Sequence, residues 1–270
     1  YNEAMHPILF QLGPLGVYSY GASIALGGVL SCLFWRPRRE RMGLRSEDDF
    51  WLLVNVLLFS AFIGGRLLFL AEYTRPFSRE FWTSLVSLSR GFSIMGAFLG
   101  VTTGLWWLSR RLATPLPRLL DYVCVPMPLW HAFGRLGCFM AGCCFGRPSD
   151  LSWAVTFRDP RSMVAPALLG RPLHPAQLYE AVGDLLIAGV LYYWVLPAVE
   201  RSRQPRGTVV AAYFLAYATL RFITEFFRGD VVRMPGLGMT AAQGLSVLMA
   251  LAAIGIYLYV RRRAQACTRP

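Results

Sequence analysis

Apolar residues recur along the chain in runs long enough to cross a lipid bilayer. A membrane-spanning helix needs about 20 predominantly apolar residues. Runs of about that length cover residues 17–35, 50–70, 91–108, 120–140, 178–196, 209–227 and 238–260. The fourth is less apolar because it carries Asp121, His131 and Arg135. The pattern predicts an all-α integral membrane protein, with about seven transmembrane helices in a single polytopic domain over residues 1–270.

Composition and charge support this class and predict which way the helices cross. Hydrophobic residues make up 55% of the chain, yet its net charge is +12, and arginine supplies the basic side chains because lysine is absent. Arginines cluster after the first, third, fifth and seventh apolar runs. Under the positive-inside rule, the amino end lies outside and the carboxyl end in the cytoplasm. Short clusters between apolar runs argue against a nucleic-acid-binding protein.

Two longer loops, residues 71–90 and 142–176, then face outward. The second is polar and turn-rich, with the segment Arg147-Pro148-Ser149-Asp150. We expect it to form a small external cap of strands or helices. The first apolar run is long enough to remain in the membrane as an anchor.

Ionisable side chains interrupt the apolar runs, and each is costly in a bilayer unless it faces a polar cavity or a partner. They are Arg66, Asp121, Arg135, Glu180, Asp184, Arg221 and Glu225. Tyr217, Arg221 and Glu225 are spaced by four residues and so share a helix face, with Arg228 a turn further. One interpretation is a structural ion pair between helices. The alternative is a site for a phospholipid phosphate, because the buried arginines are expected to outnumber the carboxylates near them.

Several motifs occur in the order found in one enzyme family. They are Gly13-Pro14 with Tyr18-Ser19-Tyr20-Gly21; Phe62-Ile63-Gly64-Gly65-Arg66 through Tyr73; Gly134-Arg135-Leu136-Gly137-Cys138-Phe139 with Gly142-Cys143-Cys144-Phe145-Gly146; His174-Pro175-Ala176-Gln177-Leu178-Tyr179-Glu180; Tyr217 with Arg221-Phe222-Ile223-Thr224-Glu225-Phe226-Phe227-Arg228; and Gln243-Gly244-Leu245-Ser246. Along nearly its whole length the chain resembles the prolipoprotein diacylglyceryl transferase family of bacterial inner membranes.

This resemblance implies transfer of a diacylglyceryl group from phosphatidylglycerol to a cysteine thiol of a lipoprotein precursor, without a cofactor. The reaction needs a thiolate and cations that stabilise the leaving phosphate. Arg135 and Arg221 match the family's essential arginines, and Tyr217 and His174 complete the expected catalytic set. The positions expected to bind or orient the substrates are Tyr20, Arg66, Asp121, Gln177, Tyr179, Glu180, Glu225 and Arg228.

The chain departs from the family at the position of its usual histidine. The family segment G-x-S-F-H-G-G corresponds to Gly91-Phe92-Ser93-Ile94-Met95-Gly96-Ala97, so Met95 replaces the histidine commonly proposed as the base. Methionine cannot accept a proton. His131 and His174 are the remaining candidates, since His6 is expected to lie outside the membrane. Either histidine can equally be a hydrogen-bonded structural residue.

Cysteines replace polar residues of the family signature G-R-x-G-N-F-x-N-x-E-x-x-G. Its two asparagines and its glutamate become Cys138, Ala141 and Cys143, and Cys144 follows. Together with His131 the thiols invite a zinc interpretation, but the usual C-x2-C pair is missing, so no metal is expected. A disulfide to Cys138 and a reactive Cys143 are further possibilities. Packing of small buried thiols is the favoured interpretation.

Three kinds of function are then compared. The leading one is a transferase that lipidates a protein cysteine, either in the usual lipoprotein precursor or, for a divergent paralogue, in another target such as a C-terminal sorting signal. A non-catalytic phospholipid-binding partner of a membrane enzyme would need the arginines but no base. A transporter is disfavoured, because the sequence shows no inverted repeat and no paired broken helices.

Overall fold

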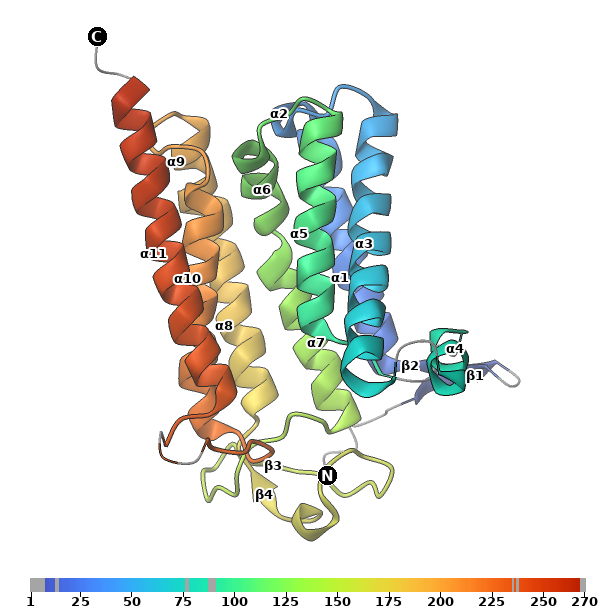
Figure 1. Ribbon diagram of the computed structural model, residues 1–270. Helices are drawn as coiled ribbons and strands as arrows, with labels where there is room; N and C mark the ends of the chain where they lie inside the picture. Colours follow the sequence, from blue (N-terminus) through green and yellow to red (C-terminus); the bar gives the residue numbers. More distant parts are fainter. Residues whose placement is uncertain are drawn as a thin grey trace. The chain divides into compact units, whose positions relative to one another are not determined.

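The computed structural model describes residues 8–12, 15–75, 78–86, 91–234, 236 and 238–267, and most of them are helical (Figure 1). The chain forms two compact units. The first combines the described residues of Tyr1–Phe34 and Asp121–Pro270, and the second is Trp35–Leu120. The hypotheses on His6, Gly13 and Pro14 lie outside the described residues.

Helices long and apolar enough to cross a membrane cover Glu47–Tyr73, Ala176–Glu200, Thr208–Phe227 and Ala241–Ala266. Within the described ranges the fold is mostly helical with little strand, which confirms the predicted class. The other predicted spans fall on helices that are shorter or less apolar. These are α1 (Ser19–Trp35), α5 (Ile94–Arg111), α6 (Leu116–Cys124) and α7 (Met127–Ala141). Seven crossings therefore stay a prediction.

The second unit is built on close packing between α3 (Glu47–Tyr73) and α5. A Cβ on Gly64 would collide with the carbonyl oxygen of Gly96, and a Cβ on Gly100 with that of Ser60. Small residues let helix backbones approach closely in a membrane, which explains the glycine-rich third apolar run. The unit also contains a 3-10 turn at Arg36–Arg38, α2 (Arg39–Met42) and α4 (Arg79–Val86).

In the first unit, α10 (Thr208–Thr224) packs against α8 (Ala176–Val190) and α11 (Ala241–Cys267), and α7 packs against α8 (Figure 1). Helix α8 continues through a π-helical turn, Leu191–Val195, into α9 (Leu196–Glu200). The predicted fourth span is instead two helices, α6 and α7, with Pro126 between them. A proline lacks the backbone N–H that a continuous helix needs, and its ring crowds the preceding turn.

Asp121, expected to bind or orient the substrates, caps the start of α10. The backbone N–H groups of Gly207 and Val209 donate to its two carboxylate oxygens at 2.8 and 3.0 Å, and the side chain is fully buried. A carboxylate at this position satisfies free N–H groups and interacts favourably with the helix dipole. At about 1.5 Å per residue, the start of α10 is about 20 Å from Arg221. The structure therefore does not bring Asp121 to Arg221.

Replacing Asp121 by alanine should lower the stability of the protein. Loss of a helix-capping acceptor costs about 0.5–2 kcal/mol. We expect the upper end of that range, because two buried N–H groups would lose their partner. Thermal unfolding in detergent measures the change, with the exposed Asp150→Ala as control. An unchanged melting temperature for Asp121→Ala would contradict the capping role.

The segment between α7 and α8 folds around a small core of its own. Strand β3 (Val155–Thr156) pairs antiparallel with β4 (Pro172–Leu173), and a 3-10 turn at Pro166–Leu168 lies between them. The core consists of Phe145, Val155, Phe157, Val164 and Leu173. Its location outside the membrane stays a prediction. A separate antiparallel hairpin, β1 (Ile8–Leu12) and β2 (Leu15–Tyr18), precedes α1.

Candidate functional site

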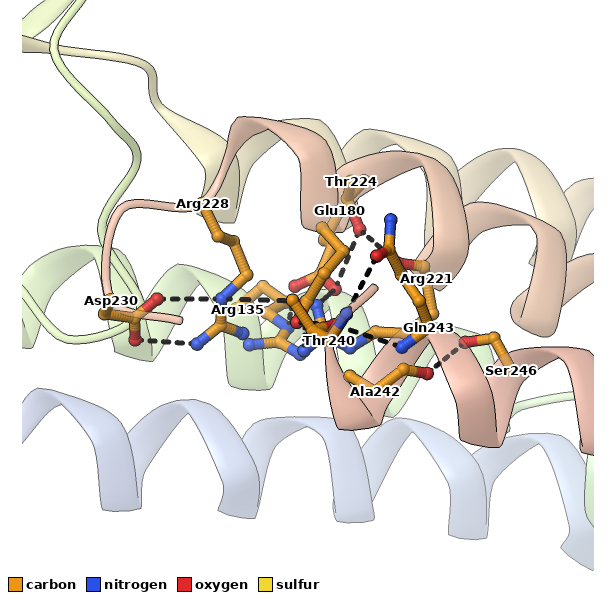
Figure 2. Close-up of polar contacts among 11 residues, drawn as sticks. Arg135, Glu180, Arg221, Thr224, Arg228, Asp230, Thr240, Ala242, Gln243 and Ser246 are labelled. Carbon is orange, nitrogen blue, oxygen red and sulfur yellow. Dashed lines mark hydrogen bonds and ion pairs between the residues drawn. The ribbon is translucent and has the colours of Figure 1, made fainter. Parts of the chain in front are cut away.

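Ionisable side chains of the first unit meet in one network supplied by α7, α8, α10 and the residues that follow α10 (Figure 2). Glu180 on α8 contacts two arginines: Arg135 Nε lies 2.5 Å from its Oε2, and Arg221 Nη1 donates to its Oε1 over 3.0 Å. Arg221 Nη2 also lies 2.7 Å from Glu225 Oε2. Arg228 Nε is 4.0 Å from that same oxygen. A continuous chain of ion pairs thus links Arg135 to Arg228.

Neutral side chains hold both carboxylates of the network in place. Thr224 Oγ1 donates to Glu180 over 3.2 Å, and Thr240 Oγ1 donates to Glu225 over 2.7 Å. Thr240 and Gln243 also form reciprocal hydrogen bonds in which each backbone N–H donates to the other's side chain. This is a capping box, and it begins α11. The first turn of the last helix therefore fixes the position of Glu225.

Charges in the network are balanced, which corrects the expected excess of arginine. Arg228 donates to Asp230 through Nε and Nη2 at 2.9 and 2.7 Å, so the three arginines meet three carboxylates within the described residues. Exposure, however, is unequal. The side chains of Glu180 and Glu225 are 4% and 2% exposed, whereas those of the arginines are 18%, 16% and 11% exposed. Asp230, at 24%, is the most exposed member of the network, but around the two buried glutamates the more accessible groups are the arginines.

Aromatic rings lie beside the network on α7 and α10. Tyr217 is one turn before Arg221, and its ring centroid lies 4.9 Å from that of His131. His131 Nδ1 is 3.3 Å from the hydroxyl oxygen of Tyr213. Of the two histidines considered as a base, His131 is thus the one that contacts the helix face carrying Arg221.

His174 belongs to a different group of side chains, just before α8. Its Nδ1 lies 3.3 Å from the Tyr179 hydroxyl, which accepts a hydrogen bond from Trp153 Nε1 over 2.8 Å, and its ring packs edge-on against Phe227. Burial lowers the pKa of His174, and the charge of Arg147 lowers it further. The imidazole is therefore neutral at neutral pH. No hydrogen bond or ion pair of the described residues joins it to the arginine network.

Backbone pairing holds Arg228 against the loop that follows α7. The N–H of Arg147 donates to the carbonyl of Phe227, and the N–H of Gly229 donates to that of Phe145, each at 2.9 Å. Arg228 lies between these two bonds in the sequence. Its backbone is therefore fixed relative to the loop, independently of the ion pairs that its side chain makes.

Three cysteine thiols gather in that same loop and at the end of α7. The Sγ atoms of Cys138, Cys143 and Cys144 all lie within 4.8 Å of one another. The thiol of Cys143 donates to the carbonyl of Cys138 over 3.8 Å, and Arg135 and Arg228 interact electrostatically with Cys144. Gln177, from α8, donates from Nε2 to the carbonyl of Cys143 over 2.8 Å.

The remaining residues of interest divide between the two units. Tyr20, half-exposed at the start of α1, lies against Gly137 of α7, where a Cβ would come within 2.9 Å of the Tyr20 backbone. Arg66 is in the second unit, where it is buried and donates from Nη1 to the Gly91 carbonyl over 2.7 Å. Met95 is also in the second unit, on α5, and is half-exposed.

Comparison with known proteins identifies the family. The family model for prolipoprotein diacylglyceryl transferase matches residues 7–259. The chain belongs to the prolipoprotein diacylglyceryl transferase family. A phosphatidylglycerol–prolipoprotein diacylglyceryl transferase of Clostridium tetani is 33% identical over 226 residues, which are 84% of this chain and 86% of that protein. The protein of that name from Neisseria meningitidis is 32% identical over 283 residues, covering 94% and 95%.

In this member of the diacylglyceryl transferase family, the network includes partners that sequence reasoning missed. These are Thr224, Thr240 and Asp230, which bind Glu180, Glu225 and Arg228 respectively. Thr240 could have been found from the sequence, because Thr240 and Gln243 have the spacing of a capping box before an apolar run. The other two have no pattern of their own, since their roles depend on contacts made only in the folded chain.

Proposed function

We propose that this protein transfers the diacylglyceryl group of phosphatidylglycerol to a cysteine thiol of a lipoprotein precursor. The sulfur attacks the glycerol carbon that carries the phosphate ester, so that an S–C bond forms while the C–O bond breaks. The thiol proton leaves, the product is a thioether, and glycerol phosphate departs. The arginine network, in a chain that belongs to this family, is the observation that carries the proposal.

The network suits a reaction in which a phosphate group gains negative charge. A phosphodiester carries one negative charge, and the departing phosphate monoester carries about 1.5–2 at neutral pH. Arg135 contacts Glu180 through Nε, and within the described part of the chain its two Nη atoms donate no hydrogen bond. Guanidinium groups bind phosphate through such paired N–H donors. Cations already in place where charge develops lower the barrier of the reaction.

Two histidine variants test how the acceptor thiol loses its proton. A cysteine of ordinary pKa, about 8.5, is only a few per cent thiolate at neutral pH. Because His174 is neutral there, it is able to accept a proton. His174→Ala should lower the transfer rate by about 10²-fold, and part of the loss should be recovered at alkaline pH, where the thiol ionises unaided. His131→Ala should change mainly the yield of folded protein.

The pH profile distinguishes a base from a merely structural histidine. Since the pKa of His174 is lowered, the rate of the unaltered protein should hold through the usual histidine range near pH 6.5 and fall only at lower pH, when the imidazole becomes protonated. His174→Ala should lack this acidic fall and gain rate steadily as pH rises. Full rates in both histidine variants at neutral pH would exclude a histidine base.

We propose a location in the bacterial inner membrane, with the amino end outside and the carboxyl end in the cytoplasm. The alternating arginine clusters support this orientation. Reporter fusions after Arg41 and after Arg263 should both give a cytoplasmic signal. An external signal at either position would contradict the predicted topology.

Transfer between purified components tests the proposed function directly. The protein, reconstituted in vesicles of phosphatidylglycerol labelled in its acyl chains, should attach label to a peptide that carries a lipoprotein-precursor cysteine. One glycerol phosphate should appear for each peptide modified, as the bond changes require. Controls are the same peptide with serine for cysteine and vesicles of phosphatidylcholine. A folded preparation that labels no peptide and releases no glycerol phosphate would refute the proposal.

A further inference from the structure

The backbone at the end of α7 brings three thiols into one group. Gly142 adopts a left-handed conformation with φ of 75°, and the N–H groups of Gly142 and Cys143 donate back to the carbonyls of Phe139 and Cys138, both at 3.2 Å. In this helix-ending motif the side chains in the positions of Cys138 and Cys143 commonly touch. Cys144 follows with φ of 57°, which is uncommon outside glycine. Its Sγ completes the group, within 4.8 Å of the other two.

We propose that Cys138, Cys143 and Cys144 bind a zinc ion through their thiolates. A Zn–S bond of about 2.3 Å places the thiolates of a tetrahedral site about 3.8 Å apart, so small side-chain rotations bring these Sγ atoms to that spacing. No histidine or carboxylate of the described residues joins the group. Three protein ligands and an open fourth position are the arrangement of catalytic rather than structural zinc sites.

Neighbouring arginines can balance the charge of a thiolate-bound zinc ion. Three thiolates and one Zn²⁺ carry a net charge of −1, which in a partly buried site needs a nearby cation. Arg135 interacts electrostatically with Cys138 and Cys144, and Arg228 with Cys144. The loop itself is held by the hydrogen bond from Gln177 to the Cys143 carbonyl. The ligands therefore lie on a fixed backbone beside the positive charge that they require.

Met95 cannot accept a proton from the acceptor thiol, whereas a zinc ion with an open coordination position would favour the ionised form of that thiol. A thiol that binds zinc is deprotonated, so the acceptor cysteine would ionise on binding, as its S–H proton passes to the base, for which His174 is proposed above, and a Zn–S bond forms. That bond breaks when the sulfur attacks the glycerol carbon and glycerol phosphate leaves. Zinc keeps its oxidation state, and no oxidant or reductant is needed. This role rests on the proposed function, whereas zinc binding by the three cysteines does not.

Metal content and cobalt spectra test the site in the full-length protein. Purified under reducing conditions without chelator, the protein should hold about one zinc ion per chain, and after exchange for Co²⁺ it should show thiolate-to-cobalt charge-transfer absorption. A variant with serine at all three positions should lose both signals. Cys32→Ser, which changes a cysteine on α1, is the matched control and should keep both.

Alkylation tests the same thiols without any substitution. Mass spectrometry should show Cys138, Cys143 and Cys144 protected from iodoacetamide in the zinc-loaded protein and reactive after chelation. The proposal is overturned if the unaltered protein takes up neither Zn²⁺ nor Co²⁺, or if the triple serine variant binds as much metal. A disulfide among these cysteines in the reduced preparation would overturn it as well.

An acceptor peptide separates the role of the metal from the proposed transfer. A cysteine peptide should shift the cobalt absorption and its serine counterpart should not, and removal of zinc should lower transfer by about 10²-fold until Zn²⁺ is restored. Full transfer by metal-free protein would overturn the role of zinc and leave the proposed function standing. Zinc binding and a thiol-dependent shift without any transfer would overturn the proposed function and leave the metal site standing.

Discussion

Substitution of Arg135 or Arg221 by glutamine should lower the rate of diacylglyceryl transfer by at least about 10²-fold. A charge-assisted hydrogen bond contributes about 1.5–3 kcal/mol, or one to two powers of ten in binding, before any loss of transition-state stabilisation is counted. Both arginines contact Glu180 and are partly exposed. Their loss should therefore remove cationic groups that a lipid phosphate can reach.

The test compares initial transfer rates at equal amounts of folded, membrane-inserted protein. Arg161→Gln is the matched control, because Arg161 is an exposed arginine paired with Asp159, and it should retain the unaltered rate. Lysine at position 135 or 221 should restore part of the rate if charge alone suffices, and little if the planar fork of arginine is required. Unaltered rates in both glutamine variants would exclude the phosphate-binding role.

Substitution of Glu180 by glutamine should destabilise the fold strongly. Glu180 is the common partner of Arg135 and Arg221, and its side chain is 4% exposed. Removing one member of a buried ion pair costs about 3–5 kcal/mol, because the remaining charge is left uncompensated. We expect about 3 kcal/mol here, since both arginines are partly exposed and water can solvate them in part.

Denaturant-induced unfolding in detergent measures the loss, with the exposed Glu72→Gln of α3 as control. A double variant that changes Glu180 and Arg221 to glutamine should be less destabilised than the sum of the two single variants. The reason is that it leaves one fewer unpaired charge, and residues in contact do not act additively. Strict additivity would contradict the coupling of these residues through their ion pair.

Most helices could be predicted because a bilayer requires long apolar runs, and each predicted run falls on a described helix. Apolar content alone could not predict whether each run forms one continuous helix. Pro126 interrupts the fourth run, although the residues on both sides are apolar. Hydropathy also could not show what Asp121 does. An aspartate lowers the hydropathy of a run by the same amount whether it caps a helix or faces a ligand.

Within the site, a contact along one helix could be predicted from residue spacing, whereas a contact between two helices could not. The pairing of Arg221 with Glu225 follows from their separation by four residues. Arg135 and Glu180 meet only because α7 packs against α8, and a single sequence carries no pattern for that contact. The cysteine group was recognised in the sequence, but no metal was expected there. Its spacing suits a helix-ending turn at Gly142 rather than the usual C-x2-C pair.

The backbone hydrogen bonds between residues 145–147 and 227–229 hold Arg228 in a fixed position relative to the loop that follows the thiols. Charges and dipoles on these two segments are oriented while the protein folds, before any lipid is bound. Little free energy is then needed to reorient them when a phosphate gains charge, whereas water would have to reorganise around the same group. Any movement that admits a lipid with two acyl chains should therefore come from other parts of the chain.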